Sequence, residues 1–143
     1  MFRALAPEVL VVEDCPAQAL RLKLLLEGQG IKVAVARSGR EALFLASLLL
    51  PDAVVLDASL PDVDGFQVCQ ALKDHPATGE TPVIMLTVND QAMNTLVGLD
   101  AGADAYIPKD CFAEDNLLRI LRDMDILAGA GQLNAKRPAK EDR

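Results

Sequence analysis

Short apolar segments alternate with longer amphipathic segments along the chain. The short segments span four to six residues, are rich in Val, Ile and Leu, and are bounded by turn residues such as Gly, Pro, Asp and Ser. Runs of this length and composition are typical of strands buried in a parallel sheet. The predicted strands are 8–12, 31–36, 53–57, 82–87 and 104–107, and the predicted helices are 16–27, 40–50, 66–73, 91–99 and 114–127.

A strand followed by a helix therefore occurs five times in succession. This alternation predicts an α/β protein whose parallel sheet is doubly wound, with right-handed crossovers and helices on both faces. The chain of 143 residues is long enough for one domain with a substantial core. We expect this domain to span residues 1–128. Residues 129–143 show no apolar periodicity and are predicted to form a disordered tail or a linker.

Composition and charge narrow the range of partners. The chain is 51% hydrophobic and carries a net charge of −7, which argues against general affinity for nucleic acid or anionic membranes. The longest apolar run, 42–50, is far shorter than the ~20 residues of a membrane span. The three cysteines are odd in number and lack metal-binding spacing, so neither a disulfide framework nor a Cys/His zinc site is expected. These features predict a soluble, cytoplasmic protein.

Polar residues stand at the carboxyl end of four predicted strands. The residues in question are Glu13, Asp14, Asp57, Thr87 and Lys109. In a parallel sheet they all fall on one rim, where open α/β folds place their ligands. Three carboxylates that converge there repel one another unless a cation joins them, and a set of ligands made only of oxygen favours Mg²⁺.

This combination is typical of phosphoryl transfer. Such a reaction needs neutralised charge and in-line positioning, and a carboxylate is an accepted phosphoryl nucleophile. Taken alone, Asp57 is better explained as a turn cap at the end of a strand, and each of the other residues as an ordinary polar loop start. Five suitable residues on one rim favour the phosphoryl-transfer site.

Four segments in this order resemble the receiver domain of bacterial response regulators. They read VVED at 11–14, LDASLPDVDG at 56–65, MLT at 85–87 and GADAYIPK at 102–109. The resemblance covers about residues 8–127, nearly all of the part expected to be ordered. It implies a flavodoxin-like (βα)5 fold with strand order 2-1-3-4-5, and a role in signalling rather than in turnover of a separate substrate.

The resemblance also implies a role for each residue of the rim. Asp57 is expected to accept a phosphoryl group from a histidine kinase or a histidine phosphotransfer protein, and Lys109 is expected to pair with the phosphoryl oxygens. The protein would catalyse only its own phosphorylation and dephosphorylation. The ligands implied for Mg²⁺ (or Mn²⁺) are Glu13, Asp14, Asp57 and the backbone carbonyl of Ser59.

Two further residues are expected to act as a switch. By the same resemblance, Thr87 moves toward the phosphoryl group and Tyr106 turns inward. An ordinary half-buried strand aromatic is the less favoured alternative for Tyr106. The signal would leave through the fourth helix, the fifth strand and the fifth helix, with Met93 and Val97 as candidate contacts. A downstream protein partner is expected on this face, and a homodimer stays open. The docking site of the kinase is implied near Gln18.

The sequence departs from the family pattern at two positions. The family most often has proline after the lysine, whereas Asp110 follows Lys109. Val88 is bulkier than the small residue usual after the threonine, and we expect it to crowd the phosphoryl site and slow hydrolysis. Two alternatives follow. One is a degenerate receiver that binds partners independently of phosphorylation. The other is an aspartyl-phosphate-forming phosphatase, which would need an acid where Ser59 stands.

Overall fold

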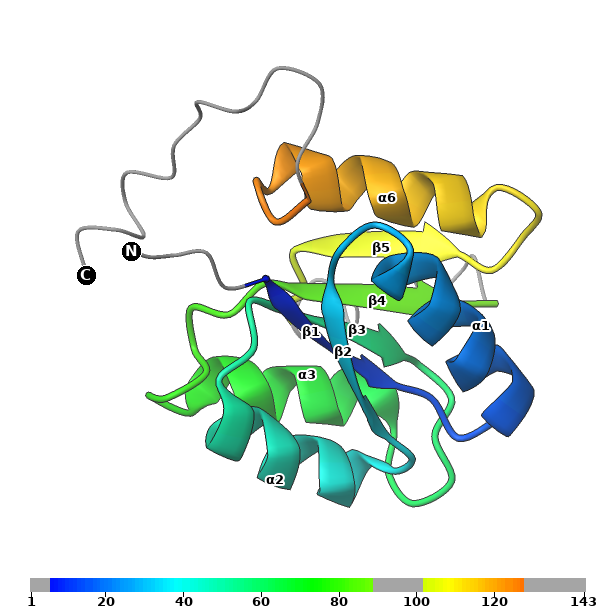
Figure 1. Cartoon of the computed structure of the whole chain (residues 1–143). Coiled ribbons are helices and arrows are strands. Elements are labelled where there is room, and N and C mark those ends of the chain that lie inside the picture. The colour runs from blue at the N-terminus through cyan, green and yellow to red at the C-terminus, as the bar shows by residue number, and fades with distance from the viewer. Residues whose placement is uncertain (1–5, 89–101, 128–143) are drawn as a thin grey trace.

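A computed structural model describes residues 6–88 and 102–127 of the chain (Figure 1). Its centre is a five-stranded sheet with the order β2-β1-β3-β4-β5, and every neighbouring pair of strands is parallel. The doubly wound fold and strand order predicted from the sequence are thereby confirmed. The strands are β1 (Glu8–Val12), β2 (Lys32–Ala36), β3 (Ala53–Asp57), β4 (Val83–Thr87) and β5 (Ala105–Pro108).

Helices cover both faces of this sheet. The described helices are α1 (Pro16–Glu27), α2 (Gly39–Leu49), α3 (Gly65–Asp74) and α6 (Ala113–Asp123). Helices α1 and α6 pack on one face, and α2 and α3 pack on the other (Figure 1). The predicted helix 91–99 lies outside the described residues, and α6 corresponds to the predicted fifth helix.

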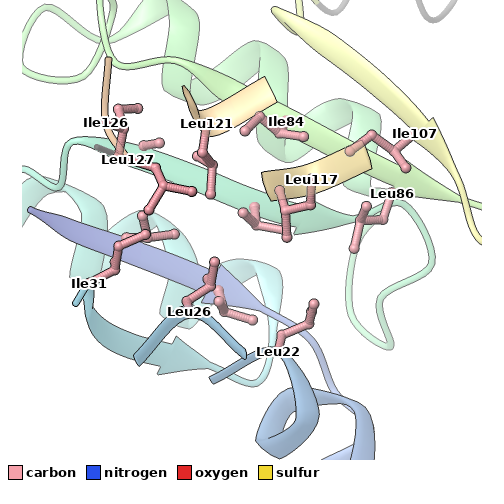
Figure 2. Close-up of a cluster of buried hydrophobic side chains, with 14 residues drawn as sticks. Leu22, Leu26, Ile31, Ile84, Leu86, Ile107, Leu117, Leu121, Ile126 and Leu127 are labelled. Atoms are coloured by element: carbon pink, nitrogen blue, oxygen red, sulfur yellow. The ribbon is translucent and has the colours of Figure 1, made fainter. Parts of the chain in front are cut away.

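Each face of the sheet has its own apolar core. On one face, side chains of alternate strand residues pack against Leu22 and Leu26 of α1 and against Leu117 and Leu121 of α6 (Figure 2). On the other face, the remaining strand residues pack against α2 and α3. Because helices cover both faces, all five residues of β3 and of β4 are buried, which explains why the first four residues of each strand are all apolar.

The end of the last helix differs from the prediction. The expected helix 114–127 was wrong at its carboxyl end, because α6 stops at Asp123. Asp125 adopts a left-handed backbone conformation (φ 62°), and the N–H groups of Ile126 and Leu127 both donate to the carbonyl of Leu121. The chain thus turns back and buries both apolar side chains in the core beside α1. The apolar pattern of the sequence therefore runs on to Leu127, although the helix has already ended.

The start of α3 fixes the loop that follows β3. Asp64 caps the helix by accepting a hydrogen bond from the Phe66 N–H at 2.9 Å. At Gly65 a Cβ atom would lie only 2.6 Å from the Cα of Ala58 and the carbonyl oxygen of Asp57. Only glycine allows this close approach, so Gly65 holds α3 against the end of β3. Among residues 6–88 and 102–127, no helix is long and apolar enough to cross a membrane.

Candidate functional site

The parallel register brings the predicted rim residues together. Val12 of β1 is paired with Leu56 of β3, so the residues that follow β1 lie beside the end of β3. Thr87 ends β4, and its register partner is Pro108, the last residue of β5. Relative exposure is 2% for Glu13, 4% for Asp57 and 3% for Thr87, whereas Asp14 is exposed. The rim therefore has a buried floor and one acidic group open to solvent.

The side chain of Lys109 reaches across the rim to Asp57. Its Nζ lies 3.0 Å from Asp57 Oδ2 and 3.7 Å from Glu13 Oε1. The backbone N–H of Lys109 donates to the carbonyl of Thr87 at 2.8 Å, which fixes the lysine relative to β4. The described residues contain no cis peptide bond, so the Lys109–Asp110 bond is trans. The lysine thus reaches the aspartate even though no proline follows it.

Both carboxylate oxygens of Asp57 have a defined donor. Oδ2 pairs with the Lys109 ammonium group, and Oδ1 accepts a hydrogen bond from the backbone N–H of Ser59 at 2.9 Å. This second bond bends the loop back toward the strand end. The carboxylate is therefore held in one orientation at the mouth of the sheet.

Glu13 is buried with one oxygen unsatisfied. Its Oε2 accepts a hydrogen bond from the Cys15 N–H at 3.3 Å, but Oε1 has no hydrogen-bond partner within the described part of the chain. Burial raises the pKa of Glu13 to about 7, and the neighbouring Asp57 carboxylate adds to the shift while the Lys109 ammonium opposes it. An ionised carboxylate in this position needs a further cation.

Three carboxylates at the rim are close enough to share that cation. Within the described ranges, Glu13, Asp14 and Asp57 each offer an oxygen atom, and these atoms lie within 4.8 Å of one another. The unsatisfied oxygen of Glu13 points to the same need. The acidic cluster could therefore bind a metal ion, and a set of oxygen ligands fits a hard divalent cation such as Mg²⁺.

The predicted switch residues lie on the neighbouring strands β4 and β5. Thr87 is buried at the end of β4. Tyr106 is half-buried, and its ring stacks at a tilt on Phe66 of α3, with the ring centroids 6.5 Å apart. Burial raises the pKa of the Tyr106 phenol. The candidate contacts Met93 and Val97 lie outside the described residues.

A cavity of about 470 Å³ opens beside the rim, between α1 and the segment that joins β5 to α6. Glu13 and Lys109 of the rim line it together with Gln18 and Leu22 of α1. Val88 also borders the cavity and is 71% exposed. A partner seated in this cavity would therefore touch the rim directly.

One contact of the loop was missed by the sequence interpretation. The carboxylate of Asp62 accepts hydrogen bonds from the backbone N–H groups of Gly39 and Arg40, at 2.8 and 3.0 Å. The two segments are more than twenty residues apart in sequence. No local pattern links them, and the acidic loop composition was the only available signal.

Fold and site together define a doubly wound α/β protein with an acidic, lysine-containing rim at the carboxyl ends of its strands. Residues 9–122 match the family described as the response regulator receiver domain. The chain belongs to this receiver domain family.

Curated relatives agree with this assignment. Response regulator MprA of Mycolicibacterium vanbaalenii is 41% identical over 128 residues, covering 87% of this chain and 54% of that protein. The DNA-binding dual master transcriptional regulator RpaA of Synechocystis is 40% identical over 114 residues, covering 80% of this chain and 47% of that protein. The chain spans about half the length of the curated relatives it matches.

Solved structures show the same fold. The receiver domain of a signal transduction histidine kinase from Syntrophus aciditrophicus superposes with a TM-score of 0.76 at 37% identity, covering 83% of this chain and 89% of that one. Chemotaxis response regulator CheY4 of Vibrio cholerae gives a TM-score of 0.76 at 28% identity, covering 83% of this chain and 98% of that one. The same fold thus occurs both in a histidine kinase and in a chemotaxis response regulator.

Proposed function

We propose that Asp57 is the phosphoacceptor of this receiver domain and takes a phosphoryl group from the phosphohistidine of a histidine kinase or a histidine phosphotransfer protein. The observation that carries this proposal is the fixed, buried Asp57 carboxylate, with the Lys109 ammonium 3.0 Å from one oxygen. A turn cap would need no lysine held beside it. We further propose that residues 1–128 form the functional unit.

The reaction is a displacement at phosphorus. A carboxylate oxygen of Asp57 forms the new P–O bond while the P–N bond to the donor imidazole breaks. The electron pair of the P–N bond stays on the imidazole nitrogen, which then takes a proton. Lys109 would pair with the phosphoryl oxygens, and the hydroxyl of Thr87, at the neighbouring strand end, would donate to one of them.

A divalent cation, Mg²⁺ or Mn²⁺, fits this rim. Its protein ligands would be the carboxylates of Glu13, Asp14 and Asp57 and the backbone carbonyl of Ser59. When bound, the cation supplies neutralisation of the negative charge that gathers on the phosphoryl oxygens. The unsatisfied Oε1 of Glu13 supports this assignment, because an oxygen buried without a hydrogen-bond donor suits a metal ligand.

We infer that phosphorylation acts through Thr87 and Tyr106 on the surface of β5 and α6, together with the predicted helix 91–99, which lies outside the described residues. Two packings close in energy, tipped by one new charge-assisted hydrogen bond, would suffice for the switch. The half-buried ring of Tyr106 supports this role, since it lies between the core and the surface. This surface would contact a downstream protein or a second copy of the chain.

The donor would approach through the cavity beside the rim, which lies between α1 and the β5–α6 segment and exposes the rim to a partner. We propose no role in nucleic-acid binding for this chain, whose net charge is −7. RpaA is a DNA-binding protein by name, but the match covers 47% of its length. The placement in the cytoplasm expected from the sequence also remains a proposal.

Incubation with acetyl phosphate tests the phosphoacceptor. We expect Mg²⁺-dependent incorporation of one acid-labile phosphate per chain, abolished by EDTA and by Asp57→Asn. Asp115→Asn is the matched control, because Asp115 is an exposed aspartate on α6. Continuous release of phosphate beyond one equivalent would instead indicate a phosphatase. A folded protein that takes up no phosphate would indicate a degenerate receiver.

A further inference from the structure

The loop that follows the phosphoacceptor is attached to a second helix besides α3. The loop, residues 58–64, passes beside the start of α2 (Figure 1). At this contact, Asp62 Oδ1 accepts from the Gly39 N–H at 2.8 Å, and Oδ2 accepts from the Arg40 N–H at 3.0 Å. These two N–H groups lower the pKa of Asp62. The contact is therefore a charge-assisted pair of hydrogen bonds.

Asp62 completes the capping of α2. The first N–H groups of a helix have no partner within the helix itself. Ser38 satisfies the N–H groups of the third and fourth residues of α2. Its side chain accepts from the Glu41 N–H at 3.1 Å, and its carbonyl accepts from the Ala42 N–H at 3.0 Å. The remaining two, Gly39 and Arg40, depend on Asp62. The loop thus supplies the negative charge that a helix amino terminus favours.

The backbone of α2 also fits the shape of the loop. A Cβ atom at Gly39 would lie 2.3 Å from Cγ2 of Val63 and 2.8 Å from Cγ2 of Val68. Glycine is therefore needed for Val63 to lie against the first turn of the helix. The hydrogen bonds of Asp62 and the packing of Val63 fix the same stretch of loop from adjacent positions.

The other end of the loop is tied to the phosphoacceptor. The Ser59 N–H donates to Asp57 Oδ1 at 2.9 Å, and Ser59 and Asp64 form an antiparallel bridge. The Gly65 N–H donates to the carbonyl of Ala58 at 3.0 Å. Asp62 lies within the short turn that this bridge closes. Asp62 and Ser59 therefore belong to the same closed turn.

We propose that Asp62 is a positioning residue: by fixing the loop 58–64 on α2, it holds the Ser59 backbone carbonyl in place as a ligand for the divalent cation. This inference rests on the proposed function and extends it to a residue outside the rim. Loss of the contact leaves the three carboxylates intact but frees the fourth ligand. Affinity for Mg²⁺ falls, whereas the rate of phosphorylation at saturating Mg²⁺ stays near that of the wild type.

Three variants separate this role from charge and from helix stability. Asp62→Ala removes both acceptor oxygens. Asp62→Asn removes the charge but keeps one acceptor oxygen. Ser38→Ala removes a different cap from the same turn of α2 and leaves the loop contact in place. Binding of Mg²⁺ is measured by calorimetry and of Mn²⁺ by electron paramagnetic resonance, and the rate of phosphorylation by acetyl phosphate is measured across a Mg²⁺ series.

We expect Asp62→Ala to weaken Mg²⁺ binding several-fold and to raise the Mg²⁺ concentration for half-maximal phosphorylation by the same factor. Asp62→Asn should lie between Asp62→Ala and the wild type, and Ser38→Ala should bind Mg²⁺ like the wild type. Wild-type affinity in Asp62→Ala, equal losses in Asp62→Asn and Asp62→Ala, or an equal loss in Ser38→Ala would each overturn the proposal. Failure of the wild type itself to bind Mg²⁺ or accept phosphate would instead refute the proposed function.

Discussion

At the scale of single residues, Glu13 makes the stability of the metal-free protein depend on pH. Its pKa is raised from 4.5 to about 7, so between these values the folded protein holds a proton that the unfolded chain has lost. The contribution of Glu13 to stability is therefore complete below about pH 4.5 and is lost as the pH rises through about 7. Above that range, the folded state carries a buried charge that disfavours it.

Glu13→Gln removes this charge and keeps a side chain of similar size. In EDTA at about pH 8, we expect the free energy of unfolding to be higher in the variant than in the wild type by on the order of 1–3 kcal/mol, and the two proteins to converge near about pH 4.5. Urea denaturation at both pH values measures the difference. An equal loss of stability at both pH values would contradict the raised pKa.

Lys109 is the only described lysine within salt-bridge distance of Asp57. We expect Lys109→Gln to slow phosphorylation by acetyl phosphate about tenfold or more, because the developing phosphoryl charge loses its ammonium partner. Lys23→Gln is the control, since Lys23 pairs with Glu27 on the outside of α1 and its loss changes the net charge equally. The rates are compared at saturating Mg²⁺. Equal rates in Lys109→Gln and Lys23→Gln would exclude a role for Lys109 in the transfer.

Val88 borders the entrance to the same site. It is 71% exposed and lines the cavity together with Glu13 and Lys109. If its side chain hinders an attacking water, Val88→Ala should lose its phosphate several-fold faster than the wild type. The half-life of the acid-labile phosphate after removal of acetyl phosphate measures this effect. A variant that loses phosphate no faster would exclude the crowding.

At the scale of elements, the sequence predicted what local patterns control. The strands could be predicted because burial on both faces of the sheet demands continuous apolar residues. Since the carboxyl ends of parallel strands share one edge, the strand ends in turn predicted that Glu13, Asp57 and Lys109 lie on one rim. The end of α6 was missed because Ile126, which follows the helix, is buried in the core. Its apolar side chain therefore looks, in the sequence, like a continuation of the helix. The contact of Asp62 with α2 was missed because it joins segments that only tertiary packing brings together.

The packing of α1 and α6 on the sheet offers a test of which force holds these helices. Leu117 is fully buried in the shared core (Figure 2), whereas the ion pair between Arg21 and Glu114 joins side chains that are 75% and 36% exposed. We expect Leu117→Ala to lower the free energy of unfolding by about 2–5 kcal/mol and Glu114→Gln to change it by less than about 1 kcal/mol. Urea denaturation of both variants measures these changes. A loss above about 2 kcal/mol in Glu114→Gln would show that the ion pair, rather than the apolar core, holds the helices.

At the scale of the whole molecule, MgCl₂ can stabilise the protein in two ways. It screens the self-repulsion of a chain with a net charge of −7, and it binds the acidic rim of the folded state. Only site binding depends on the identity of the cation. A site filled at 100 times its dissociation constant adds about 2.7 kcal/mol to the free energy of unfolding.

Asp14 separates the two contributions, because it is exposed and its substitution leaves the buried floor of the rim unchanged. We expect the melting temperature of the wild type to rise more in MgCl₂ than in NaCl of equal ionic strength, and this excess to shrink strongly in Asp14→Asn. Removal of one exposed charge outside the acidic cluster by Asp115→Asn should leave the excess unchanged. An equal rise in both salts would mean that screening alone stabilises the fold. Screening acts on the total charge, whereas coordination acts on particular oxygen atoms. The comparison of Asp14→Asn with Asp115→Asn therefore decides whether Mg²⁺ stabilises the fold by screening or by coordination.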